Sequence, residues 1–276
     1  MKTIDLLFFL LVVCTGYANS GTMPEKKSLA LNILVFSPHP DDDVIGCGGS
    51  IAKHIKSGHN VTAVYMTSGT ACPSRYSPEE LGIVREKEAT DAADILGVQN
   101  LIFLRYPDGG LAYSPEVIAM LEGLIKQTKP DKIYIPHKND SHKDHKMTYQ
   151  LVCQALASIL QKSLEEWKQP IVLCYEVWTP LQYVSHKENI TDYMPLKIAA
   201  LQKHASQIEL VRFDKAVKAL NRYRGIMKEC GRYCECFELL KWSLLKKTHA
   251  AKIHLHTPDH NLDTEAVTTE SFVVTP

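Results

Sequence analysis

Residues 31–50 read LNILVFSPHPDDDVIGCGGS, and this stretch decides the fold. Its unbroken apolar run, Ile33 to Phe36, is typical of a strand that is buried on both faces of a parallel sheet. Pro38 and Pro40 cannot donate to a sheet ladder, so we expect the strand to end there in a turn. Ligands of open parallel sheets bind beyond the carboxyl ends of the strands. The turn therefore lies where a functional site is expected.

This first polar turn combines one imidazole with three adjacent carboxylates, Asp41, Asp42 and Asp43. A cation would offset the mutual repulsion of the carboxylates. His39 and Asp42 are three residues apart and can converge on one metal ion, while Asp41 points elsewhere and can act as a base. Capping of a helix by acidic residues is the alternative. Three carboxylates beside a histidine and two prolines favour the metal site over capping alone.

Downstream, strand-like and helix-like segments alternate. We expect Gly46, Gly48 and Gly49 to allow close backbone approach before the first helix. The expected helices cover 50–57, 77–96, 115–126, 147–167 and 213–228, with another starting near Pro195, and the expected strands cover 60–66, 101–104, 132–135 and 171–176. Segment 185–190 is rich in turn residues. This order predicts an α/β fold: a Rossmann-like, three-layer arrangement with a mostly parallel sheet and the active site at the carboxyl ends of its strands.

A second polar turn follows the expected strand at 132–135 and leads into a helix that begins near Asp140 or Ser141. His142 and His145 share a face if they lie on the first helical turn. One of them can then bind a metal while the other donates a proton, and Asp144 can orient an imidazole. An exposed polar helix start would explain either histidine singly. Two such turns at strand ends favour a functional site.

Residues 37–69, SPHPDDDVIGCGGSIAKHIKSGHNVTAVYMTSG, resemble the opening of the LmbE-like, or PIG-L, zinc-dependent N-deacetylases. The sequence His142-Lys143-Asp144-His145 is similar to the second motif of that family, and the likeness extends over residues 31–240. The resemblance implies a Zn²⁺ cofactor. The zinc ligands that it implies are His39, Asp42 and His145.

The same resemblance implies roles for neighbouring residues. Asp41 would be the general base, His142 the general acid or electrostatic partner, and Asp144 the residue that positions a histidine. Arg85 begins an Arg-x-x-Glu pattern and is similar to the family residue that grips the sugar, although a solvated surface arginine is nearly as good an interpretation. His204 lies in a late run that resembles the family, and it either lines the pocket or simply bonds its neighbours.

The implied reaction is removal of an N-acetyl group from a small-molecule glucosamine-containing conjugate by metal-activated water. The segment 108–110 and Trp178 would help to set what lies beyond the acetylated amine. One alternative is a zinc amidohydrolase that acts on a different amide, for example an antibiotic-like compound or a thiol-cofactor precursor. Another is a non-catalytic, metal-dependent sugar-binding protein. A base and an acid beside an open metal position favour an enzyme.

The two ends of the chain differ from the middle. Residues 1–20 have a charged start, an apolar core at 6–13 and small residues at 18–20, so we expect a secretory signal and an exported protein, periplasmic or secreted. An uncleaved anchor is the alternative, but the apolar run is shorter than the roughly twenty residues that span a membrane. We expect the deacetylase-like domain at 21–240 and a mobile C-terminal extension at 241–276.

The charge balance and the cysteine count of the sequence bear on its binding partners and disulfides. The 31 basic residues balance the 31 acidic ones, which argues against binding to nucleic acid, and the oligomeric state stays open. Seven cysteines remain once Cys14 leaves with the signal, and an odd number in an exported protein leaves at least one thiol unpaired within the chain. The Cys230–Cys236 segment lacks a second ligand pair for a zinc knuckle. We expect a disulfide within it, or from it to Cys72.

Overall fold

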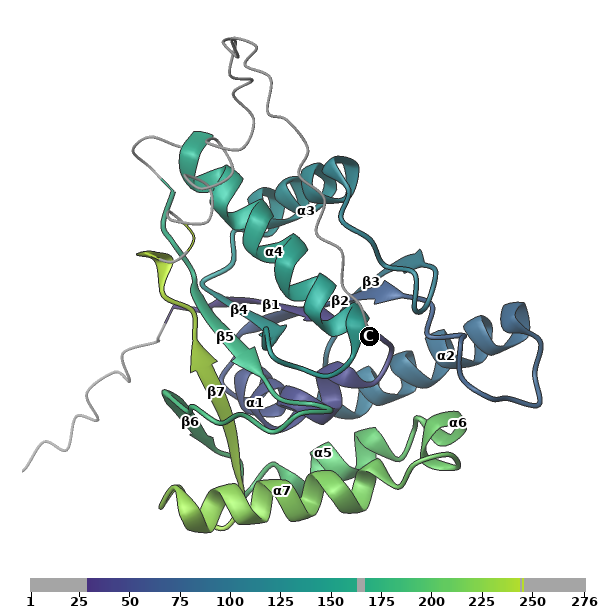
Figure 1. The fold of residues 1–276 in the computed structure, drawn as a ribbon. Coiled ribbons are helices and arrows are strands. Elements are labelled where there is room, and N and C mark those ends of the chain that lie inside the picture. The colour runs from purple at the N-terminus through teal and green to yellow at the C-terminus, as the bar shows by residue number, and fades with distance from the viewer. Residues whose placement is uncertain (1–28, 163–166, 244, 246–276) are drawn as a thin grey trace, which may run out of the picture.

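The computed structural model describes residues 29–162, 167–243 and 245. Its strands are β1 (Asn32–Ser37), β2 (Asn60–Thr67), β3 (Asn100–Tyr106), β4 (Lys132–Pro136), β5 (Ile171–Tyr175), β6 (His186–Asn189) and β7 (Cys234–Leu239). They form one sheet in the order β3-β2-β1-β4-β5-β7-β6 (Figure 1). Strands β1 to β5 pair in parallel, whereas β7 is antiparallel to both β5 and β6.

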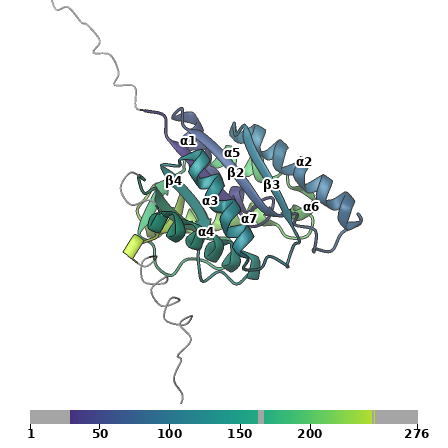
Figure 2. The same ribbon diagram turned by 90° about the horizontal axis from the view of Figure 1, so that it is seen from above.

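Helices cover both faces of this sheet. They are α1 (Asp42–Lys56), α2 (Pro78–Leu96), α3 (Pro115–Thr128), α4 (Lys143–Lys162), α5 (Met194–Leu201), α6 (Ala205–Ile208) and α7 (Phe213–Met227). Helices α3 and α4 lie on one face, and α1, α2, α5 and α7 lie on the other (Figures 1 and 2). The predicted three-layer α/β fold with a mostly parallel sheet is confirmed.

Strand β1 is central because both of its faces are buried. Ile33 and Val35 pack into the apolar cluster that includes α1 and α5, while Leu34 and Phe36 pack into the cluster that includes α3 and α4. The chain moves from β1 to one side of the sheet through β2 and β3, and then returns to β4 on the other side of β1. The strand order therefore reverses between β1 and β4, and the crevice beyond their carboxyl ends is the expected ligand site.

Helix α1 begins at Asp42, well before the expected helix, because the glycines belong to the helix rather than to a loop. A Cβ atom on Gly46 would overlap the Tyr175 ring, and one on Gly49 would lie 2.7 Å from Ile190 Cβ. The missing side chains therefore let α1 pack directly against β5 and the segment after β6. The prediction that these glycines serve close approach is right, but the predicted helix start is wrong.

A buried ion pair formed by residues from later in the chain binds the backbone of α1. The helix kinks at Cys47, and the amides of Gly49 and Ser50 beyond the kink donate to the Glu235 carboxylate, each at 2.8 Å. Lys197 Nζ lies 2.6 Å from Glu235 Oε1, and both side chains are almost completely buried. Strand β7 and helix α5 thus hold the helix that follows the first polar turn.

Strand β6 and the cysteines differ from the sequence-based expectations. Residues 186–189 form an edge strand on β7 instead of a turn-rich segment. The seven described cysteines are all free thiols, so the expected disulfide is absent from the described part of the chain. Cys234 and Cys236 lie two residues apart on one strand, with their sulfur atoms 3.9 Å apart. Such a pair has Cα atoms about 6.7 Å apart, at the long end of disulfide geometry.

The terminal predictions fall largely outside the described residues. This holds for the expected signal at 1–20 and for most of the extension from residue 241. Trp242 is described, and its indole Nε1 donates to the Pro170 carbonyl at 3.2 Å while its ring packs edge-on against Trp167. Within the described ranges, none of the helices combines the length and apolarity that a membrane crossing needs.

Candidate active site

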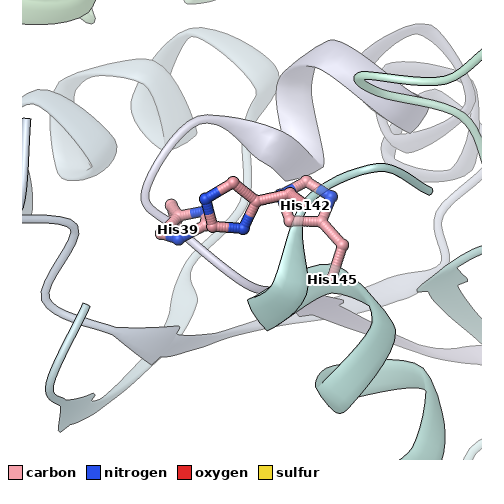
Figure 3. A group of neighbouring side chains, drawn as sticks. All are labelled: His39, His142 and His145. Carbon is pink, nitrogen blue, oxygen red and sulfur yellow. The ribbon is translucent and has the colours of Figure 1, made fainter. Parts of the chain in front are cut away.

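The two polar turns meet at the carboxyl ends of β1 and β4. His39 follows β1, and His142 and His145 lie at the start of α4, which follows β4. The three imidazole rings point toward one another (Figure 3), with the His39 centroid 4.7 Å from that of His142 and 5.3 Å from that of His145. The expected juxtaposition of the two turns is therefore present.

Asp42 lies between two of these histidines. Its Oδ2 is 2.9 Å from His39 Nδ1 and 3.0 Å from His145 Nε2. His145 is fully buried, yet neither of its ring nitrogens has a hydrogen-bond partner within the described part of the chain. Ligand atoms around a tetrahedral zinc ion lie about 3.3 Å apart. Two imidazoles and one carboxylate are ligand types that zinc binds, and His39, Asp42 and His145 as the ligands of one zinc ion stay a prediction.

Other donor combinations also surround His39. Ring nitrogens of His39, His142 and His145 lie within 4.8 Å of one another, and so do ligand atoms of His39, Asp108 and Asp144. Burial alone would lower the pKa of His39, but Asp108, Asp144 and Asp42 together raise it well above its usual range. The predicted ligands His39 and His145 both belong to the first group, whereas Asp42 belongs to neither and contacts both histidines directly.

Asp140 is a site residue that the sequence interpretation treated only as a helix start. Its Oδ2 lies 3.6 Å from His145 Nδ1, on the side of the ring opposite Asp42. Its carboxylate also accepts the amides of His142 at 2.9 Å and Trp178 at 3.1 Å. A carboxylate behind a ligating histidine fixes the tautomer and orientation of that ring. Asp140 therefore ties the α4 histidines to the loop after β5.

Asp144 and Asp108 support His39 rather than His145. Asp144 Oδ2 lies 3.2 Å from His39 Nε2 and accepts the Gly109 amide at 2.6 Å. Asp108 Oδ1 lies 3.1 Å from the same His39 nitrogen. Asp144 lies where it can position a histidine, as the sequence predicts. Asp108 appeared in the sequence interpretation only as part of a substrate-facing loop.

Asp41 is the buried carboxylate beside the candidate metal ligands. Burial raises the pKa of Asp41 to about 7, although the neighbouring Arg85 guanidinium acts in the opposite direction. A base works best when its pKa is close to the operating pH. The Asp41 backbone has a φ of 142°, a conformation that side-chain-bearing residues rarely adopt. This strained backbone fits a residue whose position the site requires.

Arg85 is the partner that holds Asp41. Its Nη2 donates to Asp41 Oδ2 at 3.1 Å and to the Pro40 carbonyl at 2.7 Å, and its Nη1 donates to the Gly69 carbonyl. Only 3% of Arg85 is exposed, so the alternative of a solvated surface arginine is wrong. Arg85 borders the cavity, but its hydrogen bonds go to the protein. Its main contribution is therefore to position the Asp41 carboxylate.

His142 is oriented by hydrogen bonding and stacking. Its Nδ1 accepts the Asp144 amide at 3.2 Å, which leaves Nε2 to carry the ring hydrogen. The ring stacks on Trp178 with centroids 6.4 Å apart. Burial, followed by the charges of His39 and His145, lowers the pKa of His142. A neutral ring with an Nε2 hydrogen suits an electrostatic partner better than a permanently protonated acid.

His204 does not border the cavity. It is completely buried, and neither of its ring nitrogens has a hydrogen-bond partner among the described residues. Burial, followed by the nearby Arg85 charge, lowers the pKa of His204 to about 3. Of the two expectations for His204, neither is met among the described residues: the residue does not border the cavity, and its ring nitrogens do not bond its neighbours.

Several of the site residues line one cavity of about 560 Å³, which is within the range of small-molecule sites. Its lining combines charged and imidazole side chains with apolar ones. The lining residues are His39, Asp41, Asp42, Ile45, Ala71, Cys72, Pro73, Arg85, Asp108, Gly109, His142, Lys143, Trp178, Gln207, Leu210, Val211 and Phe213.

Comparison with known proteins shows which proteins this chain is similar to. The family model PIG-L, described as GlcNAc-PI de-N-acetylase, matches residues 34–156. "Uncharacterized deacetylase YaiS" of Escherichia coli (strain K12) is 32% identical over 186 residues, which cover 63% of this chain and 90% of that protein. Diacetylchitobiose deacetylase of Thermococcus kodakarensis is 30% identical over 189 residues, which cover 63% of this chain and 69% of that protein.

A solved structure is similar over most of its length. N,N'-diacetylchitobiose deacetylase from Pyrococcus horikoshii has a TM-score of 0.66 and 30% identity, and the match covers 75% of this chain and 83% of that one. The fold and the His/Asp cluster define an α/β protein with a candidate metal centre at the switch point of its sheet. The chain belongs to the PIG-L family, as the sequence resemblance predicts.

Proposed function

We propose that this protein is a zinc-dependent hydrolase that removes the N-acetyl group from a glucosamine-containing conjugate. Family membership and the names of its relatives support a deacetylase acting on N-acetylated sugars. The observation that carries the proposal is the pairing of two neighbouring carboxylates with different environments. Asp42 faces two histidines, whereas Asp41 is buried, is held by Arg85 and has a pKa raised to about 7.

His39, Asp42 and His145 would hold the zinc ion. When bound, the ion supplies a water of lowered pKa and a Lewis acid for the amide carbonyl. The remaining groups of the site belong to the protein itself. Asp144 and Asp108 contact His39 Nε2 and would hold that imidazole in its ligating orientation, while Asp140 faces His145 Nδ1 at 3.6 Å.

Asp41 and His142 divide the proton chemistry between them. Asp41 takes a proton from the attacking water and passes it to the departing nitrogen. The hydroxyl of the water stays on the acetyl carbon, so the products are acetate and a free amine. The Nε2 hydrogen of His142 is available to the oxygen on which negative charge develops. Arg85 keeps the Asp41 carboxylate at a fixed position throughout. The proposed reaction is hydrolysis of an amide.

A screen of N-acetylated compounds tests this function. Zinc-loaded protein is incubated with N-acetylglucosamine glycosides and, in parallel, with N-acetylated amines that carry no sugar, and released acetate is measured. We expect acetate from the glycosides. Release from the sugar-free amides alone would contradict the proposed substrate class and favour the different-amide hypothesis. A zinc-bound protein that releases acetate from none of them would contradict the proposed activity.

A further inference from the structure

Part of the cavity wall is apolar and exposed. Trp178 is 47% exposed, Leu210 47% and Val211 43%, and all three border the same cavity as His39 and Asp41. Phe213 continues this wall and contacts Trp178 edge-on, with ring centroids 5.5 Å apart. Exposed apolar side chains that gather at the mouth of a site mark a binding surface. We call Trp178, Leu210, Val211 and Phe213 the apolar wall.

The apolar wall is held at a fixed place relative to the reacting groups. The Trp178 amide donates to Asp140, whose carboxylate also faces His145. The Trp178 ring lies between His142, on which it stacks, and Phe213, which meets it edge-on. A group bound on this wall would therefore lie beside the acetamido sugar rather than at an unrelated surface.

The chemistry of the wall selects against a hydroxylated occupant. Among its neighbours in the cavity, Gln207 offers an amide, but its Nε2 already contacts Cys72 Sγ at 3.4 Å and Ser206 Oγ at 3.1 Å. Hydroxyl groups of a second sugar that face Leu210, Val211 and Phe213 would lose water there, and these side chains offer no hydrogen bond in return, which is unfavourable. Alkyl or aryl groups lose no hydrogen bonds there.

We propose that the substrate carries an apolar aglycone, an alkyl or aryl group, that binds on the apolar wall while its N-acetylglucosamine unit lies at the candidate metal centre. This inference rests on the proposed deacetylase function and specifies its substrate class. Trp178, Leu210, Val211 and Phe213 are then the residues that determine specificity.

The test compares three glycosides of N-acetylglucosamine in both anomeric forms where they exist: the methyl glycoside, the octyl glycoside below its micelle concentration, and diacetylchitobiose. Acetate release gives kcat/KM for each. We expect the octyl glycoside to exceed the methyl glycoside by at least about tenfold, because burial of about two methylene groups is enough for that gain. Diacetylchitobiose is expected to stay close to the methyl glycoside.

Two leucine variants test whether the apolar wall causes the preference for the octyl glycoside. Leu210→Asn is expected to lower the octyl-to-methyl ratio of kcat/KM by at least about threefold, since each buried methylene group contributes a similar factor. Leu196→Asn is the matched control, because Leu196 is 42% exposed on α5 and does not border the cavity. That control should keep both the ratio and the activity of the wild type.

The outcomes separate this inference from the function on which it rests. Acetate release with equal kcat/KM for the octyl and methyl glycosides, or with a preference for diacetylchitobiose, would overturn the apolar aglycone and leave the deacetylase standing. An octyl preference that both leucine variants retain equally would overturn the assignment to the wall. No release from any glycoside would overturn the deacetylase and the aglycone together.

Discussion

Replacement of Asp41 by asparagine is expected to lower kcat for acetate release by about 10²- to 10⁴-fold, the usual contribution of a general base. Asparagine has nearly the same shape and its amide oxygen can still accept from Arg85, but it cannot take a proton from water. Because the base acts only in the transition state, KM is expected to change little. Zinc content should stay at the wild-type value, since Asp42 rather than Asp41 faces the histidines.

Steady-state kinetics and metal analysis of the same preparations check this expectation. Asp91→Asn is the matched control, because Asp91 pairs with Lys87 on the surface of α2, away from the cavity. Its kinetics should equal those of the wild type. Full activity of Asp41→Asn on a substrate that the wild type cleaves would show that another group acts as the base.

The second large effect is on stability. Lys197→Met is expected to lower the free energy of unfolding by about 3–5 kcal/mol, because it leaves the Glu235 carboxylate buried without its countercharge. The carboxylate would keep the amides of Gly49 and Ser50 as donors, but these are neutral. Urea denaturation of the wild type and the variant measures the difference.

Two further variants isolate the uncompensated charge. Lys197→Met combined with Glu235→Gln removes both charges and should recover much of the lost stability. Lys53→Met removes the cation of a half-exposed pair with Glu188, and such pairs contribute about 0–1 kcal/mol. A loss of less than 1 kcal/mol in Lys197→Met would contradict the account of a buried ion pair that binds the backbone of α1.

The sequence predicts much of this architecture because its strongest signals are local. The apolar run of β1 and the polar residues that follow β1 and β4 are each contained in a few consecutive positions. Parallel strands then bring both turns to one edge of the sheet. Helix α2 was predicted with its ends as observed, since Ser77 caps it and Gly97 ends it in the left-handed conformation.

The predictions fail where a residue's structure or role depends on contacts with segments that are distant in the sequence. The glycines of α1 looked like a loop because their helical role depends on Tyr175 and Ile190, which lie far along the chain. Asp140 and Asp108 gain their roles only from the histidines that they face in three dimensions. The solvated-surface interpretation of Arg85 was wrong because its pairing with Asp41 depends on how α2 packs beside the first turn.

The central claim is that His39, Asp42 and His145 hold the metal while His142 stays free for chemistry. Zinc content per chain, measured for the wild type, His145→Ala and His142→Ala, tests it most directly. The account predicts about one zinc ion in the wild type and in His142→Ala, and far less in His145→Ala. Loss of zinc from His142→Ala to the same extent as from His145→Ala would contradict the account, because the three histidines would then form the metal site.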